Sequence, residues 1–337
     1  MDYQNKYKQA YLKIKHASRI LVVGHLNPDG DALSSVCAFL ELATLLGIPA
    51  DAYCHDKRIS AFNYLPHESK ILDNKELILP LTKYDVITIV DCGAKSRTFL
   101  ANEIDEVASS IDRPFIIEFD HHPHVDDFSD LEIRQPDKAS TTEVVYNFLE
   151  SNQIPFNKNL ANCILTGLLT DTGNFLYSSA NSTNIKIASK MLSRGASLPK
   201  IINNTLRNQS LLTMKLWGTA LNNLQFSENH GLAYSVITKQ EIDSILNTSS
   251  EEEVSRYLSY DIYGDIAGFL STVSDAEAIM LLREEKEGKI KGSLRTSKAN
   301  VDVSVLAKKF GGGGHTKASG FMIEGQLVKT ENGWEIV

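Results

Sequence analysis

The sequence predicts an α/β fold of two domains: a mainly parallel sheet with helices on both faces, then a smaller α/β domain with a mixed sheet. The chain has 337 residues, which is enough to bury two separate cores. Apolar strand-like runs alternate with helical segments through the first half, a pattern typical of parallel sheets covered on both faces. A long helical stretch then precedes a second group of strand-like runs.

Apolar runs in the first half predict strands at residues 19–25, 50–56, 84–93 and 113–122. Segments with a helical apolar stripe predict helices at 31–49, 140–152 and 160–173. Gly47 and Pro49 end the first of these helices. Together they predict a first domain over residues 1–185.

Residues 181–224 are almost entirely helix-like, which predicts a helical linker at 186–225. The same stretch could instead support a homodimer, an alternative that the sequence leaves open. Further strands are predicted at 231–238, 266–273, 277–285 and 289–296. A helix, a glycine loop and another helix or strand follow over 302–323, which gives a second domain at 226–337.

Composition narrows the class of protein. The formal charge of −8 argues against the broad basic surface of proteins that grip long duplex nucleic acid. The cysteines are scattered without a C-x-x-C pair, which suits a reducing cytosol. The N-terminus is too polar for a signal peptide, and no apolar run approaches the roughly 18 residues of a transmembrane helix. We therefore expect a cytoplasmic protein without membrane association.

Acidic and imidazole side chains follow the predicted strands at their carboxyl ends, where open α/β sheets bind ligands. They come from four segments, "GHLNPDGD", "IVDCG", "FDHH" and "GLLTDTG", and comprise His25, Asp29, Asp31, Asp91, Asp120, His121, His122 and Asp171. Each alone has a simpler explanation: Asp91 as a turn former, Asp31 as a helix N-cap, the histidines as a solvated turn. The combination has no common structural purpose, and so many carboxylates without cations would repel one another.

Carboxylate and imidazole ligands without thiolate suit Mn²⁺, with Mg²⁺ or another divalent ion as alternatives. The ligands are too many for one ion with an open position, so the sequence predicts two metals. Paired divalent ions stabilise both the attacking and the leaving oxygen in phosphoryl transfer. The sequence therefore predicts hydrolytic phosphoryl chemistry.

A second constellation lies in "FGGGGHTKASG", near the C-terminus. Gly311, Gly312, Gly313 and Gly314 would let backbone N–H groups approach a phosphate or carboxylate, with Arg295, His315 and Lys317 adding positive or hydrogen-bonding character. The alternative is a plain flexible loop, which seldom sits between an amphipathic helix and an apolar segment.

These motifs, in this order, resemble the DHH phosphoesterase superfamily with its DHH-associated C-terminal domain. The length and the glycine-rich signature resemble the stand-alone (NrnA-type) subfamily of oligoribonuclease/3′-phosphoadenosine 5′-phosphate (pAp) phosphatases. The residue near Ala94 departs from the more usual acidic or hydroxyl side chain, which bears on fine specificity.

The resemblance implies a role for each matched residue. His25, Asp29 and Asp91 would hold one metal, and Asp31, Asp91, His121 and Asp171 the other, with Asp91 bridging. His122 would contact the scissile phosphate or protonate the leaving oxygen, and Asp120 would orient the histidines. Arg295, Gly311, Gly312, Gly313, Gly314 and His315 would bind the far side of the substrate.

The resemblance also implies an activity. The expected enzyme hydrolyses short oligoribonucleotides to mononucleotides, and pAp to AMP, with a metal-bridging hydroxide as nucleophile. The first alternative is a relative that acts mainly on cyclic or linear dinucleotides such as c-di-AMP and pApA. The second is a catalytically silent nucleotide-binding regulator, against which the presence of every expected ligand counts.

Overall fold

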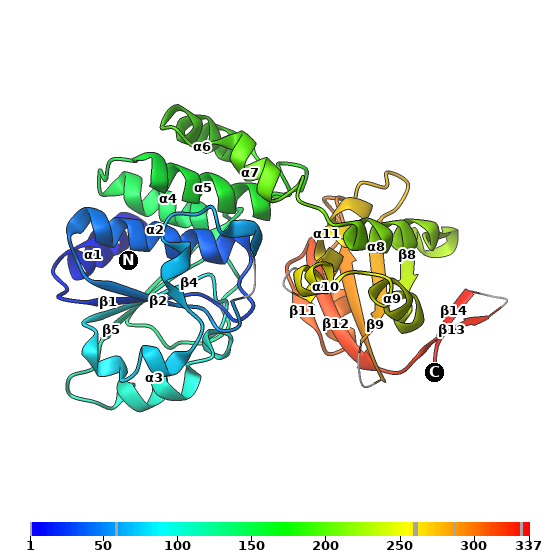
Figure 1. Ribbon diagram of the computed structural model, residues 1–337, viewed down its shortest axis with the longest axis horizontal. Helices are drawn as coiled ribbons and strands as arrows, with labels where there is room; N and C mark the ends of the chain where they lie inside the picture. Colours follow the sequence, from blue (N-terminus) through cyan, green and yellow to red (C-terminus); the bar gives the residue numbers. More distant parts are fainter. Residues whose placement is uncertain (1, 58–59, 259–261, 286–287, 331–332) are drawn as a thin grey trace. The chain divides into compact units, whose positions relative to one another are not determined.

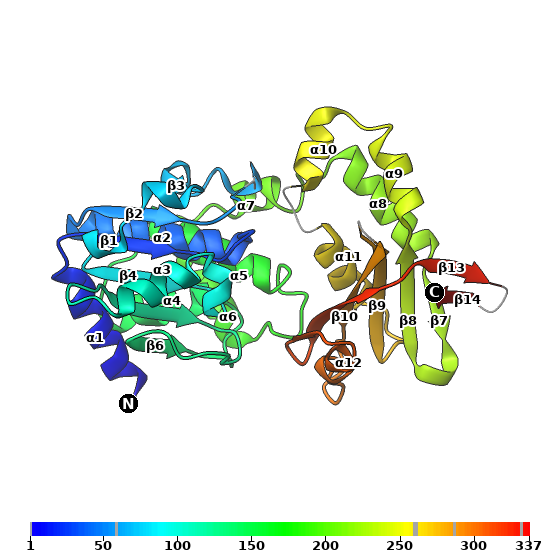
Figure 2. The ribbon, with the colours of Figure 1, turned by 90° about the horizontal axis from the view of Figure 1, so that it is seen from below.

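The computed structural model describes residues 2–57, 60–258, 262–285, 288–330 and 333–337. The chain divides into two compact units, Met1–Asn208 and Gln209–Val337. Each unit has its own sheet (Figures 1 and 2). Each also has its own hydrophobic clusters. No helix in the described part of the chain is long and apolar enough to cross a membrane.

The first unit is built on a parallel sheet with the order β3-β2-β1-β4-β5-β6. Its strands are β1 Ile20–Val23, β2 Ala50–Tyr53, β3 Ile71–Leu72, β4 Val86–Val90, β5 Phe115–Asp120 and β6 Leu131–Arg134. Its helices are α1 Tyr3–Lys15, α2 Gly30–Leu46, α3 Ala101–Ala108, α4 Thr141–Ser151, α5 Lys158–Asp171, α6 Ser182–Ser193 and α7 Leu198–Asn204.

The sheet is covered on both faces, as the continuous apolar strands predict. Figure 1 shows α3 on one face and α2, α4 and α5 on the other. Strand β1 is buried along its whole length and sends Ile20 and Val22 into the cluster under α2, α4 and α5. Leu21 and Val23 join the cluster under α3. The predicted α/β class with a parallel sheet is thus confirmed.

The strand order reverses at β1, which pairs with β2 on one side and β4 on the other. In open α/β sheets the loops after two such strands diverge and leave a crevice beyond the strand ends. The segments that follow β1, β4 and β5 carry most of the first-unit residues singled out in the sequence, and Asp171 ends α5. The topology therefore places them at the ligand-binding edge of this fold.

Helices α2 and α5 pack closely because glycine occupies position 167. A Cβ at Gly167 would lie 2.4 Å from Asp31 Oδ1 and 2.5 Å from Thr142 Cγ2. Helix α2 begins at Gly30 with Asp29, and not Asp31, as its N-cap, since the Asp29 side chain accepts from the backbone N–H groups of Asp31 and Ala32. The Asp31 carboxylate therefore has no capping role on its own helix.

The second unit has a mixed sheet with the order β11-β12-β10-β9-β8-β7, and Figure 2 labels β10, β9, β8 and β7. Strands β8 and β9 are parallel and the other pairs antiparallel. Its elements are α8 Leu211–Asn222, β7 Gln225–Ser227, β8 Leu232–Ile237, α9 Lys239–Leu246, α10 Glu251–Leu258, α11 Ile262–Leu270, β9 Ala278–Glu284, β10 Lys289–Arg295, α12 Ser304–Lys309, β11 Gly313–Gly314, β12 Ala318–Glu324, β13 Leu327–Thr330 and β14 Gly333–Ile336.

The strand predicted at 266–273 is wrong, because residues up to Leu270 belong to helix α11. Ile262, Ile266 and Leu270 are buried at a spacing of four, which marks a helix face. The apolar run "IAGFL" looks the same in either structure, so its composition alone could not decide. The segment after the glycine loop, left open between helix and strand, is strand β12.

The glycine run is packed against β12. Gly313 and Gly314 pair with Gly320 and Ser319, and a Cβ at Gly312 would lie 2.1 Å from the Gly320 carbonyl oxygen. The N–H groups of Gly311, Gly312 and His315 already donate to backbone carbonyls. Close packing therefore accounts for glycine at 312 without any ligand.

We expect Gly167→Ala to lower the free energy of unfolding by about 1–3 kcal/mol, because the new methyl group overlaps the Asp31 and Thr142 side chains. Gly218→Ala is the matched control. Gly218 also lies within a helix, but a Cβ there meets nothing within 4 Å. This second change should raise stability by up to about 1 kcal/mol. Urea unfolding measures both, and equal effects would contradict the close packing at residue 167.

Candidate metal centre

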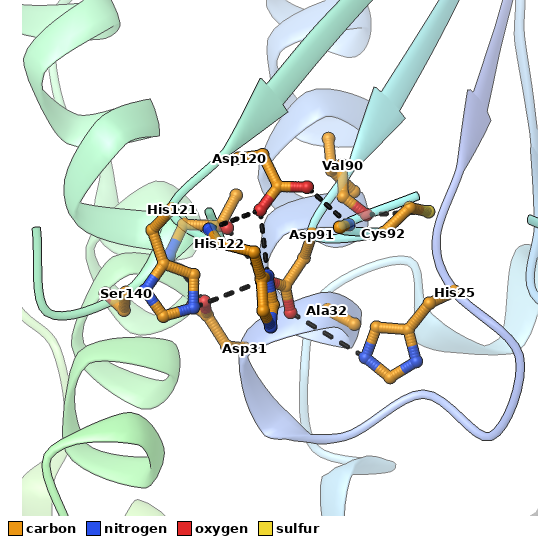
Figure 3. Close-up of polar contacts among 12 residues, drawn as sticks. His25, Asp31, Ala32, Val90, Asp91, Cys92, Asp120, His121, His122 and Ser140 are labelled. Carbon is orange, nitrogen blue, oxygen red and sulfur yellow. Dashed lines mark hydrogen bonds and ion pairs between the residues drawn. The ribbon is translucent and has the colours of Figure 1, made fainter. Parts of the chain in front are cut away.

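The structure brings the predicted strand-end residues of the first unit into one cluster (Figure 3). His25 follows β1, Asp91 follows β4, and His121 and His122 follow β5. Asp29 and Asp31 come from the start of α2, and Asp171 is the last residue of α5. Side chains from separate segments thus converge at the carboxyl edge of the sheet.

One group of potential ligands comprises His25, Asp29 and Asp91, whose ligand atoms lie within 4.8 Å of one another. His25 Nε2 is 3.7 Å from Asp29 Oδ2 and 3.7 Å from Asp91 Oδ2. The other ring nitrogen, Nδ1, lies 2.8 Å from the Leu26 carbonyl oxygen. A proton on Nδ1 leaves Nε2 as an acceptor, and this buried atom has no hydrogen-bond partner among the described residues. Such an orphaned nitrogen suits a metal ligand.

A second group comprises Asp31, Asp91 and His121, again within 4.8 Å. His121 Nε2 lies 3.6 Å from Asp91 Oδ1 and 3.3 Å from Asp171 Oδ2, which adds Asp171 to this side of the cluster. Its Nδ1 faces the Lys138 carbonyl oxygen at 3.3 Å. The His121 ring is therefore oriented like that of His25, with Nδ1 toward a backbone carbonyl oxygen and Nε2 toward the carboxylates.

Asp91 belongs to both groups. Its Oδ2 faces His25 and its Oδ1 faces His121, and the side chain is buried. The backbone at Asp91 has a φ of 59°, an uncommon conformation that turns the chain directly after β4. Thr141, at the start of α4, donates a hydrogen bond from Oγ1 to Asp91 Oδ1 at 2.8 Å. Asp91 thus faces both groups of potential ligands.

The carboxylates of the cluster crowd one another. Burial, followed by the charges of Asp31 and Asp29, raises the pKa of Asp91 and of Asp171 well above the ordinary range. Burial and the neighbouring Asp29 raise the pKa of Asp31 to about 7, although the backbone N–H groups of Thr141 and Thr142 donate to it. Protein atoms alone therefore offset this charge only in part, and cations fit the cluster.

Asp120 and His122 form a separate pair beside Asp91. His122 Nδ1 lies 2.8 Å from Asp120 Oδ1, and the His122 backbone N–H donates to the same oxygen at 2.7 Å. The other oxygen of Asp120 accepts from the Gly93 N–H at 2.5 Å. Asp120 thus orients His122 through both its ring and its backbone.

Arg134, at the end of β6, supports this pair and was missed by the sequence reasoning. It ion-pairs with Glu118, lies 3.6 Å from Asp120 Oδ2, and donates from Nη1 to the His122 carbonyl oxygen at 3.0 Å. The available signal was its place at another strand end, in "LEIR", although β6 itself was not predicted. His124 lies two residues after His122 and faces Glu132 at the surface.

The predicted substrate-binding residues Arg295, Gly311, Gly312, Gly313, Gly314 and His315 lie in the second unit. Arg295 ends β10 opposite Ala318, which exchanges backbone hydrogen bonds with His315. These two side chains therefore start from neighbouring backbone positions. Lys317 has a structural role, since its Nζ donates to the carbonyl oxygens of Lys298, Ala299 and Val301.

Comparison with known proteins gives consistent results. The bifunctional oligoribonuclease and PAP phosphatase NrnA of Thermus thermophilus is 26% identical over 306 residues, which cover 91% of this chain and 84% of that protein. A probable manganese-dependent inorganic pyrophosphatase of Streptococcus mutans is 28% identical over 160 residues, which cover 46% of this chain and 48% of that protein. The crystal structure of an exopolyphosphatase-related protein from Bacteroides fragilis is 26% identical, with a TM-score of 0.79 over 94% of this chain and 91% of that one.

Two family models match the chain. The model of the DHH family N-terminal domain matches residues 19–168, and that of the DHHA1 domain matches residues 238–332. Together they span well over half of the chain and correspond to the two units of the structure. The chain belongs to the DHH family of metal-dependent phosphoric ester hydrolases.

Proposed function

We propose that this enzyme hydrolyses short oligoribonucleotides to mononucleotides and pAp to AMP. The observation that carries the proposal is the pair of ligand groups that share the buried Asp91. The named relative from Thermus thermophilus, matched over most of both chains, supports this choice of substrates within the family. The net charge of −8 agrees with short substrates rather than long duplexes, and the scattered cysteines agree with a cytoplasmic enzyme.

Two divalent cations, most favourably Mn²⁺, are part of the proposal. His25, Asp29 and Asp91 would hold one, and Asp31, Asp91, His121 and Asp171 the other. Carboxylate oxygens with imidazole nitrogens are donors that suit Mn²⁺, and one matched relative is named as manganese-dependent. When bound, such ions supply Lewis acidity, which lowers the pKa of water and draws charge from a phosphoryl group.

The protein's own residues then position the substrate and protonate its leaving oxygen. His122, held by Asp120, lies 3.6 Å from Asp91 Oδ1 and so borders the metal centre. We assign it to contact with the scissile phosphate and to protonation of the leaving oxygen. The contact between Asp120 Oδ1 and His122 Nδ1 fixes the orientation of this ring. Arg295, His315 and the glycine run are assigned to the far side of the substrate.

Purified protein with Mn²⁺ should hydrolyse pAp and a five-nucleotide RNA faster than pApA, c-di-AMP or polyphosphate. His122→Ala should lower kcat by about 10²–10⁴-fold, the usual contribution of a general acid. His124→Ala is the control, because this histidine is exposed and pairs with Glu132. Survival of both pAp and RNA would end the hydrolase proposal, and faster cleavage of pApA or c-di-AMP would reassign the substrate.

Mn²⁺ should raise the Tm of the wild-type protein above its value in EDTA. At a hundredfold excess over Kd, one bound ion raises the free energy of unfolding by about 2.7 kcal/mol. Asp91→Asn should lose most of this rise, because both ions lose a ligand. Its Tm in EDTA should stay near the wild-type value or exceed it, since a crowded buried acid is removed. Asp127→Asn is the matched control, with a side chain that is 98% exposed. An undiminished Mn²⁺ effect in Asp91→Asn would refute the shared ligand.

A further inference from the structure

A short 3₁₀ helix, η5 (Lys95–Thr98), follows the turn that carries Asp91 and presents two cations. The first, Lys95, is neutralised: its Nζ lies 2.5 Å from Asp105 Oδ1, and its backbone N–H donates to Asp126. The second, Arg97, is partly buried. Its guanidinium makes no hydrogen bond or ion pair with any residue in the described part of the chain.

The Arg97 guanidinium lies next to His122. A Cβ built on Gly93 would be 3.4 Å from Arg97 Nη1 and 3.4 Å from His122 Cγ. Both side chains therefore cover the same glycine, whose φ of 70° also disfavours any other residue there. Two groups that meet over one backbone position can reach the same small anion.

The backbone of Arg97 is fixed by hydrogen bonds, whereas its guanidinium makes none within the described ranges of the chain. The Arg97 carbonyl oxygen accepts from the Leu26 N–H at 2.7 Å, and the Thr98 side chain donates to the Lys95 carbonyl oxygen at 2.7 Å. The first of these bonds ties η5 to the loop that carries His25. The cation thus borders the metal centre.

We propose that Arg97 binds non-bridging oxygens of the phosphoryl group being cleaved, on the His122 side of the metal centre. A guanidinium presents N–H donors in a fork that matches two phosphate oxygens and keeps its charge at any working pH. Phosphoryl transfer concentrates charge on these oxygens in the transition state, so a fixed cation there accelerates the reaction. The inference rests on the proposed function, in that it presumes a phosphoester substrate at this centre.

The test compares Arg97→Ala, Arg97→Lys and Lys95→Ala with the wild type in saturating Mn²⁺. Two substrates are used: pAp, which has a second phosphate, and bis(p-nitrophenyl) phosphate, which has only the one being cleaved. Arg97→Ala should lose about 10²–10³-fold in kcat/KM on both, the usual effect of removing a donor to transition-state charge. Arg97→Lys should recover part of the rate. Lys95→Ala should stay within about twofold of wild type, since an exposed ion pair contributes little.

Two further measurements separate contact with substrate from a structural role. Millimolar guanidinium chloride should restore part of the activity of Arg97→Ala but none of that of His122→Ala, because only the former lacks a guanidinium. Calorimetric titration with inorganic phosphate should show weaker binding to Mn²⁺-loaded Arg97→Ala, while Mn²⁺ affinity stays at the wild-type value.

The inference is overturned if Arg97→Ala keeps near wild-type rates, or if it loses rate on pAp alone, which would assign Arg97 to the second phosphate. Loss of Mn²⁺ affinity without loss of phosphate binding would also overturn it. Failure of the proposed function looks different: the wild-type protein itself would then spare both substrates. In that case the phosphate titration alone decides whether Arg97 is an anion ligand.

Discussion

The carboxylate of Asp91 is buried beside four other aspartates. Several features of the first unit make room for this charge or offset part of it. The reversal of strand order at β1 opens the sheet edge where it sits. Thr141 donates to it from the start of α4, and glycine at 167 leaves room for the neighbouring Asp31. A buried acid is tolerated where donors or cations offset it. The local architecture is thus organised around a charge that the chain offsets only in part.

The sequence predicted the cluster well because parallel strands deliver their carboxyl ends to one edge, so polar residues after apolar runs must meet there. His25, Asp91 and His121 were found in this way. Arg97 was not, because it sits on a 3₁₀ helix whose position depends on the turns at Asp91 and Gly93. Arg134 was missed because its short strand β6 gave no distinct apolar run. Contacts that depend on tertiary geometry leave little trace in local pattern.

The fold, too, was predicted correctly where the local pattern was distinct and wrongly where it was ambiguous. Long apolar strands and striped helices were placed correctly, and the two-domain α/β class is confirmed. The run at 266–273 failed because a short, fully apolar segment fits a buried strand and a buried helix equally well. The glycine run illustrates a related ambiguity, since glycine serves close backbone packing as readily as ligand approach. At Gly312 the structure shows the packing, against Gly320 and Phe321.

The position of Leu26 bears on the affinities of the proposed ion and substrate. Its carbonyl oxygen faces Nδ1 of His25, while its N–H donates to the Arg97 carbonyl oxygen. One residue therefore joins the segment that holds a proposed metal ligand to the segment that carries the proposed phosphate ligand. Order imposed on this junction by one ligand lowers the entropy cost of binding the other, and such coupling is reciprocal. Ion and substrate would then each bind more tightly in the presence of the other, in addition to the effect of any contact between them.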